Sequence, residues 1–137
     1  MAINRDRAEK AIESAEREFR NAVRSLEDRD YVGSLKYLQE SMEYAVKAVL
    51  IAYGIDYPKI HGVGRFLYEI REKCPPCFLQ EIQAIAEVTD NLARGRPKFR
   101  YPYEHPPEQY EATAREILPE VKKSLENCQK LIKQLFG

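Results

Sequence analysis

The chain has 137 residues, of which 44% are apolar, and its 22 basic side chains balance 22 acidic ones, so the formal net charge is zero. This length fits one domain spanning residues 1–137, and the frequent large apolar residues exclude a disordered chain. A neutral chain is also unlike proteins that coat DNA, which need a surplus of Lys and Arg.

Apolar residues recur at steps of three and four along almost the whole chain, and no useful stretch alternates as a β-strand would. The pattern predicts an all-α protein, an antiparallel up-and-down bundle of about five helices. The expected helices span residues 5–27, 31–53, 63–72, 78–92 and 108–135. Asp30 is expected to cap the second helix and Gly54 to follow its end, while Pro119 is expected to kink or divide the last helix.

The cysteines and the hydropathy pattern indicate the cellular compartment in which the protein is expected. Three cysteines are an odd number, which fits a reducing environment, and the polar N-terminal segment does not resemble a secretory signal. No apolar run is long enough to cross a bilayer. Cys74 and Cys77 form a Cys-Pro-Pro-Cys motif, but it lacks the further ligands of a zinc site and the preceding strand of a redox motif. We expect a cytoplasmic protein with a plain turn at these cysteines, no metal and no cofactor.

A cationic segment follows the fourth predicted helix. Its four cations are Arg94, Arg96, Lys98 and Arg100. Removing these four from the 22 basic side chains leaves 18 against 22 acidic ones, so basic charge is concentrated here. Gly95 and four prolines predict that residues 93–107 form a loop. With Tyr101 and Tyr103 available to stack on bases, the segment is a candidate site for phosphates or nucleobases.

Residues 40–67 read ESMEYAVKAVLIAYGIDYPKIHGVGRFL, a helix that ends in Gly and continues into a Pro-x-x-His connector. Together with Arg100-Tyr101-Pro102 and the long last helix, this segment resembles the HEPN domain, named for higher eukaryotes and prokaryotes nucleotide-binding. The resemblance implies an antiparallel helix bundle and, for many members, a cytoplasmic homodimer with a minimal nucleotidyltransferase as partner. Some members that it resembles are metal-independent endoribonucleases, often toxins, with an Arg-x(4–6)-His motif.

Arg100 and His105 satisfy the spacing of that motif, and the chemistry suits RNA cleavage. Histidine titrates near neutrality and can take the proton of the 2′-hydroxyl, while arginine stabilises charge that grows on the phosphate. The sequence departs from the family in one respect, because the family motif lies on a helix and here prolines follow both residues. A related Arg-x4-His-x-Tyr acceptor motif does not carry over, because Pro107 occupies its last position.

His61 lies in the connector that follows the second predicted helix. It is interpreted either as a second base or ligand-binding residue near a cleft, or as a histidine that orders the start of the third helix. Several helices also carry apolar residues on more than one face, which predicts a homodimer.

Three functions are therefore open. The first, which we favour, is a module that binds a nucleotide, an RNA or a partner nucleotidyltransferase. The second is an endoribonuclease with Arg100 and His105 as catalytic residues, and the third is a noncatalytic dimeric scaffold. The candidate ligand-binding residues are Arg94, Arg96, Lys98, Tyr101, Tyr103 and His61.

Overall fold

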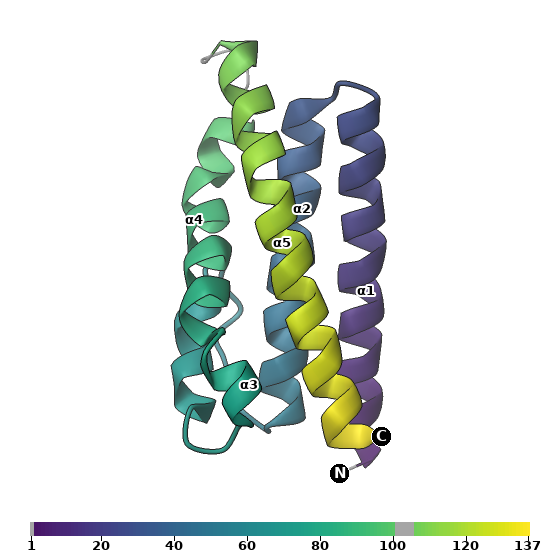
Figure 1. The fold of residues 1–137 in the computed structure, drawn as a ribbon, viewed down its shortest axis with the longest axis vertical. Coiled ribbons are helices and arrows are strands. Elements are labelled where there is room, and N and C mark those ends of the chain that lie inside the picture. Colours follow the sequence, from purple (N-terminus) through teal and green to yellow (C-terminus); the bar gives the residue numbers. More distant parts are fainter. Residues whose placement is uncertain (1, 101–105) are drawn as a thin grey trace.

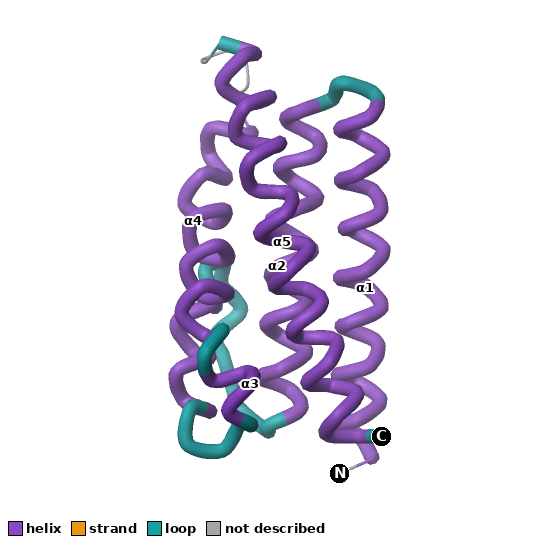
Figure 2. The backbone as a smooth tube through the Cα atoms, in the orientation of Figure 1, coloured by secondary structure: helices purple, strands orange, loops and turns teal. Residues whose placement is uncertain are grey.

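The computed structural model describes residues 2–100 and 106–137, with side chains described for residues 4–95 and 106–137. These residues form helices and no strands (Figures 1 and 2). The elements are α1 (Ala2–Glu27), α2 (Tyr31–Ala52), the 3-10 helix η1 (Gly64–Ile70), α3 (Pro76–Leu79), α4 (Ile82–Arg100) and α5 (Pro107–Phe136). Four long helices run up and down, and the two ends of the chain lie at the same end of the bundle (Figure 1). The predicted all-α bundle is confirmed.

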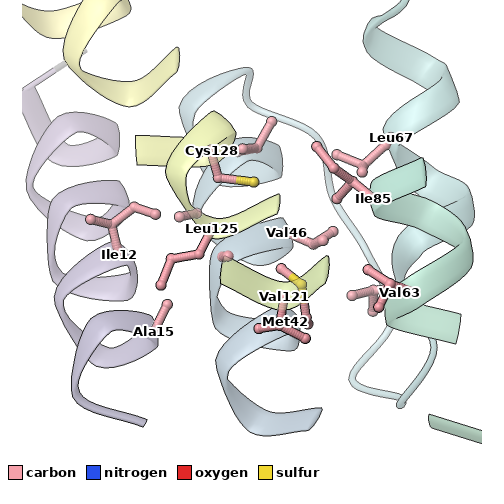
Figure 3. Close-up of a cluster of buried hydrophobic side chains, with 14 of the residues drawn as sticks. Ile12, Ala15, Met42, Val46, Val63, Leu67, Ile85, Val121, Leu125 and Cys128 are labelled. Carbon is pink, nitrogen blue, oxygen red and sulfur yellow. The ribbon is translucent and has the colours of Figure 1, made fainter. Parts of the chain in front are cut away.

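Helix α2 is the central element, because it packs against α1, α4 and α5. Figure 3 shows how core side chains of α1, α2, α4 and α5 converge, among them Ile12, Val46, Ile85 and Leu125. All four are buried apolar side chains, as the three- and four-residue spacing predicted. The core therefore fixes the position of every long helix relative to α2.

Small residues let α1 and α2 approach closely. Ala8, Ala15 and Ala22 are completely buried and lie seven residues apart, which is about two helical turns. The Ser34 hydroxyl donates to the carbonyl of Ala22 at 2.9 Å, and the Ser41 hydroxyl donates to the carbonyl of Ala15 at 2.8 Å. Side-chain hydroxyls reach the backbone of the neighbouring helix only because no large side chain lies between the two helices.

The ends of α2 follow local sequence signals. Asp30 caps the start, and its carboxylate accepts from the backbone N–H of Gly33 at 2.9 Å. Gly54 follows the end with a φ of 70°, a conformation that glycine adopts without a steric penalty. Both predictions are confirmed, and the turn at Gly54 directs the connector back along the bundle (Figure 2).

Three predictions about the middle of the chain need correction. The third helix is a 3-10 helix, η1, and the predicted fourth helix is divided into α3 and α4. Residues 93–100 are not a loop, because α4 continues to Arg100. Pro97 removes one backbone donor, which helices tolerate with a local bend. Cations near a helix C-terminus also interact favourably with the helix dipole, which stabilises the helix. The prediction of a loop considered the Pro and Gly residues and left this effect out.

Pro119 lies inside α5, which continues from Pro107 to Phe136 as one helix. The sequence predicted that Pro119 would either kink this helix or divide it, and the helix is not divided. Among the described residues, no helix combines the length and the hydropathy that crossing a membrane requires. The exposed large apolar residues that the structure describes are Tyr44, Ile60, Tyr68, Leu79 and Leu135. They lie on several different elements, and the homodimer stays a prediction.

Tyr53, at the end of α2, carries a buried polar group whose effect on stability can be measured. Its hydroxyl is buried and has no hydrogen-bond partner among the described residues. Burial raises the pKa of Tyr53, and the nearby Cys74 thiol adds to the rise. Because a buried hydroxyl without a partner costs free energy, Tyr53→Phe should raise the free energy of unfolding by about 1 kcal/mol. Urea denaturation followed by circular dichroism measures this, and a clear loss of stability would contradict it.

Candidate functional site

A pocket of about 660 Å³ lies between the first turns of α1, the C-terminal half of α2 and the connector to η1. We call it the connector pocket. Its polar lining consists of Asn4, Arg7, Lys47, Asp56, Lys59 and His61. The rest of the lining is Tyr57, Gly54 and the aliphatic side chains of Ile51, Ile55 and Ile60. Three separate segments of the chain thus meet in one concave surface.

The helical register explains which side chains reach the connector pocket. Asn4 and Arg7 lie three residues apart on α1, so they share one face of its first turns. Lys47 and Ile51 are likewise one turn apart on α2. The positive φ of Gly54 then turns the chain out of α2, and the connector returns over this face.

A buried carboxylate lies behind His61. The Glu43 side chain is only 9% exposed, and its Oε1 lies 2.8 Å from His61 Nδ1. The same oxygen accepts from Gln39 Nε2 at 3.0 Å, and Lys47 Nζ is 4.0 Å from the other oxygen. Burying a charge is costly unless it is paired and hydrogen-bonded, and these three partners meet that need. The network also holds the His61 ring against α2.

The connector pocket has a surplus of positive charge. Arg7, Lys47 and Lys59 line it with Asp56 as the one acidic lining residue among those described. Lys47 also lies over the ring of Tyr57, 5.9 Å from the centroid. Burial raises the pKa of Tyr57, and the Arg7 charge works against that rise. The phenol therefore stays neutral and adds no negative charge to the pocket.

The family model of the HEPN domain matches residues 8–133 of the chain. The chain belongs to the HEPN domain family. The resemblance noted at residues 40–67 is thereby confirmed. The match covers the α2 and connector residues of the connector pocket and begins one residue after Arg7. No curated protein sequence and no solved structure gave a significant match.

Of the two candidate residues whose side chains the structure describes, His61 and Arg94, His61 lines the connector pocket of this HEPN domain. Arg94 is exposed on α4, where its guanidinium donates to the Asn91 side chain. Arg96, Lys98 and Arg100 belong to α4, but their side chains are outside the described residues. The predictions at Tyr101, Tyr103 and His105 also fall outside the described residues.

The connector that carries His61 also approaches α4. Gly62, which follows His61, lies close to Asp90 and Ala93 of α4. Ala93 immediately precedes Arg94, so the connector contacts α4 one residue before the cationic segment begins.

Sequence reasoning missed the other charged lining residues of the connector pocket, Arg7, Lys47, Asp56 and Lys59. It also missed the buried Glu43 behind His61. Lys47 did give a signal, because it interrupts the most apolar run of the chain. Glu43 gave none, since its partner His61 lies 18 residues away and meets it only after the connector folds back.

The cysteines do not form a chemical site in the part of the chain that the structure describes. Cys74 is partly buried, Cys77 is exposed in α3, and Cys128 lies in the core. Burial raises the pKa of Cys128 to about 12, so it remains a thiol. No cluster of three or more His, Cys, Asp or Glu residues is arranged to hold a metal ion within the described ranges.

Proposed function

We propose that this HEPN domain is a nucleotide- or RNA-binding module whose ligand enters the connector pocket. One observation carries the proposal, namely the three cations around a concave surface with a single acid among its described lining residues. Membership of the HEPN family supports a module related to nucleotides or RNA in general. The volume of about 660 Å³ lies within the range of small-ligand pockets.

The chemistry of the lining suits a phosphate group. Arg7 offers a planar guanidinium that can donate two parallel hydrogen bonds, and Lys59 adds a second cation from the connector. Tyr57 supplies an aromatic ring of the kind on which bases stack. Because the pocket is open to water, salt screens these charges, and binding should weaken as ionic strength rises.

The proposal extends to a longer ligand. The connector reaches α4 at Gly62, next to the segment that carries Arg94, Arg96, Lys98 and Arg100. We propose that single-stranded RNA extends from the connector pocket along this segment, with its phosphates near the cations. A homodimer and a nucleotidyltransferase partner, both implied by the resemblance, remain part of the proposal, as does a cytoplasmic location.

Charge reversal in the pocket tests the proposal. The double variant Arg7→Glu/Lys59→Glu should bind ADP and a short single-stranded RNA at least ~10-fold more weakly, because each reversal replaces an attraction to phosphate by repulsion. Isothermal titration at two salt concentrations measures the affinity and its salt dependence. Arg24→Glu/Lys36→Glu makes the same two charge changes at exposed positions, at the opposite ends of α1 and α2 from the pocket. It is the matched control and should bind normally. Equal affinity in the double variant and the control would contradict the proposal.

The endoribonuclease remains a second candidate, because α4 extends to Arg100 and so provides the helical context that the resemblance implies for the motif's arginine. Incubating the protein with structured RNA in EDTA separates the two functions. Cleavage that survives chelation and is lost in His105→Ala would establish the nuclease. Binding without cleavage would leave the binding module, and neither binding nor cleavage would leave the noncatalytic scaffold.

A further inference from the structure

We propose that the connector pocket prefers guanine nucleotides, with the Asp56 carboxylate accepting two hydrogen bonds from the base. This inference rests on the proposed function of the pocket as a nucleotide site. It assigns the base to Asp56 and the phosphate to the cations Arg7 and Lys59.

Asp56 is the one acid among the described residues that line the connector pocket. It is exposed, and within the described part of the chain its carboxylate has no hydrogen-bond or ion-pair partner. The Glu43 carboxylate behind His61 differs in both respects, because it is buried and bonded to His61 and Gln39. Asp56 is therefore the carboxylate that a ligand can reach and engage.

The ligand group that Asp56 contacts has to be a hydrogen-bond donor, because an ionised carboxylate only accepts. A phosphate has the same sign of charge as the carboxylate, so the phosphate lies toward Arg7 and Lys59 instead. The remaining donors of a nucleotide are on its base and its sugar. Tyr57 follows Asp56 in the chain and lines the same pocket, and its aromatic ring suits stacking on a base. We therefore assign the base to this part of the pocket.

The edges of the common bases differ in how well they match a carboxylate. Guanine alone carries two adjacent donors, the ring N1–H and the 2-amino group, and the two carboxylate oxygens can accept from both in parallel. Adenine and cytosine place one amino group beside a ring nitrogen that is an acceptor. Uracil places one N–H between two carbonyl oxygens. In these three bases an acceptor faces the second carboxylate oxygen and repels it, so Asp56 favours guanine.

Asn4 adds a donor that fits the same base. Its amide lines the connector pocket, and Nδ2 lies 3.9 Å from the position that a Cβ on Gly54 would occupy. Gly54 precedes Asp56 by two residues, so this amide lies beside the start of the segment that carries the carboxylate. Guanine has its O6 acceptor next to N1–H, whereas adenine has a donor at the corresponding position. A donor near a carboxylate is thus the complement of guanine and not of adenine.

The test compares bases on one sugar and one phosphate. GMP, AMP, CMP and UMP are titrated into the protein by calorimetry at about pH 7.5, where an aspartate is ordinarily ionised. We expect GMP to bind roughly tenfold more tightly than AMP, the effect of two hydrogen bonds to a charged group. IMP lacks the 2-amino group and should bind with an affinity between those of GMP and AMP.

Two RNA pentanucleotides distinguish the sources of the guanine. Both consist of uridines, and the central residue is a guanosine in one and an adenosine in the other. A guanine preference among the mononucleotides or between the pentanucleotides supports the inference. The set in which it is larger identifies the ligand as a free nucleotide or an RNA chain.

Asp56→Asn tests the residue itself. Asparagine offers one acceptor and one donor in place of two acceptors, so GMP should lose its advantage over AMP. Xanthosine monophosphate has a carbonyl oxygen where GMP has the 2-amino group, and it should bind the variant more tightly than the unchanged protein. Asp28→Asn, in the turn between α1 and α2 at the opposite end of the bundle, is the matched control and should keep the guanine preference. Circular dichroism verifies that both variants fold.

The outcomes separate this inference from the proposed function. Nucleotides that bind with equal affinity whatever their base would overturn the inference and leave the proposed function intact. A guanine preference that persists in Asp56→Asn would also overturn it. An equal loss of all four nucleotides in that variant would do the same, because the carboxylate would then contact a group that all four share. If no nucleotide binds at all, the proposed function fails and this inference fails with it.

Discussion

Replacing Ala15 with leucine should lower the free energy of unfolding by about 3 kcal/mol, one of the two largest effects expected in this protein. Ala15 is completely buried between α1 and α2, and its carbonyl accepts from the Ser41 hydroxyl at 2.8 Å. A leucine has no room there unless α1 moves away from α2. That movement would stretch the Ser41 bond and the matching bond from Ser34 to Ala22.

Ala11→Leu is the matched control for this change. Ala11 also lies on α1, but it is only partly buried at the edge of the core, so the added atoms can extend toward solvent. Its cost should stay below about 1 kcal/mol. Urea denaturation of both variants gives the comparison, and equal losses would show that the contact between the helices is not the cause.

The same change links packing to the connector pocket. Asn4 and Arg7 project from the first turns of α1, two to three turns before Ala15 on the same helix. Because α1 is one continuous helix, moving it at Ala15 also moves Arg7 relative to Lys47 on α2. Ala15→Leu should therefore weaken ADP binding in any fraction that remains folded.

Local signals were sufficient to predict most of the fold. The three- and four-residue spacing located α1, α2 and α5. α1 and α5 each have an apolar face toward the core, and α2 is buried on several faces by α1, α4 and α5. Asp30 and Gly54 marked the ends of α2 through backbone chemistry that acts within three residues. Such features depend little on the rest of the chain, which is why the sequence alone predicts them.

The extension of α4 to Arg100 could not be predicted in this way. Pro97 and Gly95 argue for a loop when each is weighed by its own propensity. A helix that is already nucleated and packed as far as Leu92 adds further residues at low cost, since propagation is easier than nucleation. The loop prediction was wrong because it judged residues 93–100 as an isolated segment, whereas they extend a helix that is already formed.

The candidate site was only partly predictable for a related reason. His61 was identified from its place in the connector, whereas Arg7 and Lys59 come from segments that approach each other only in the folded protein. Nothing in the sequence distinguishes Glu43 from the other charged residues of the predicted helices. It is buried in the structure because the connector folds back and His61 contacts its carboxylate.

Gly64→Ala should be the other strongly destabilising change, with a loss of about 3 kcal/mol. A Cβ at Gly64 would lie 2.7 Å from the carbonyl oxygen of Ala86 and 2.8 Å from its Cα, both backbone atoms of α4. Backbone in a packed helix cannot move aside as a flexible side chain can. η1 would have to separate from α4, and the bond from Gly64 N–H to Asp90 Oδ1, now 3.1 Å, would be lost.

Gly54→Ala distinguishes this clash from ordinary backbone strain. Gly54 has a φ of 70°, but the nearest atom to an added Cβ there is 3.9 Å away. Its cost should be the strain of a left-handed alanine alone, about 1 kcal/mol. Urea denaturation should rank Gly64→Ala well above Gly54→Ala, and the reverse order would refute the contact between η1 and α4. Because His61 precedes Gly64 by three residues, a displaced η1 should also release His61 from Glu43.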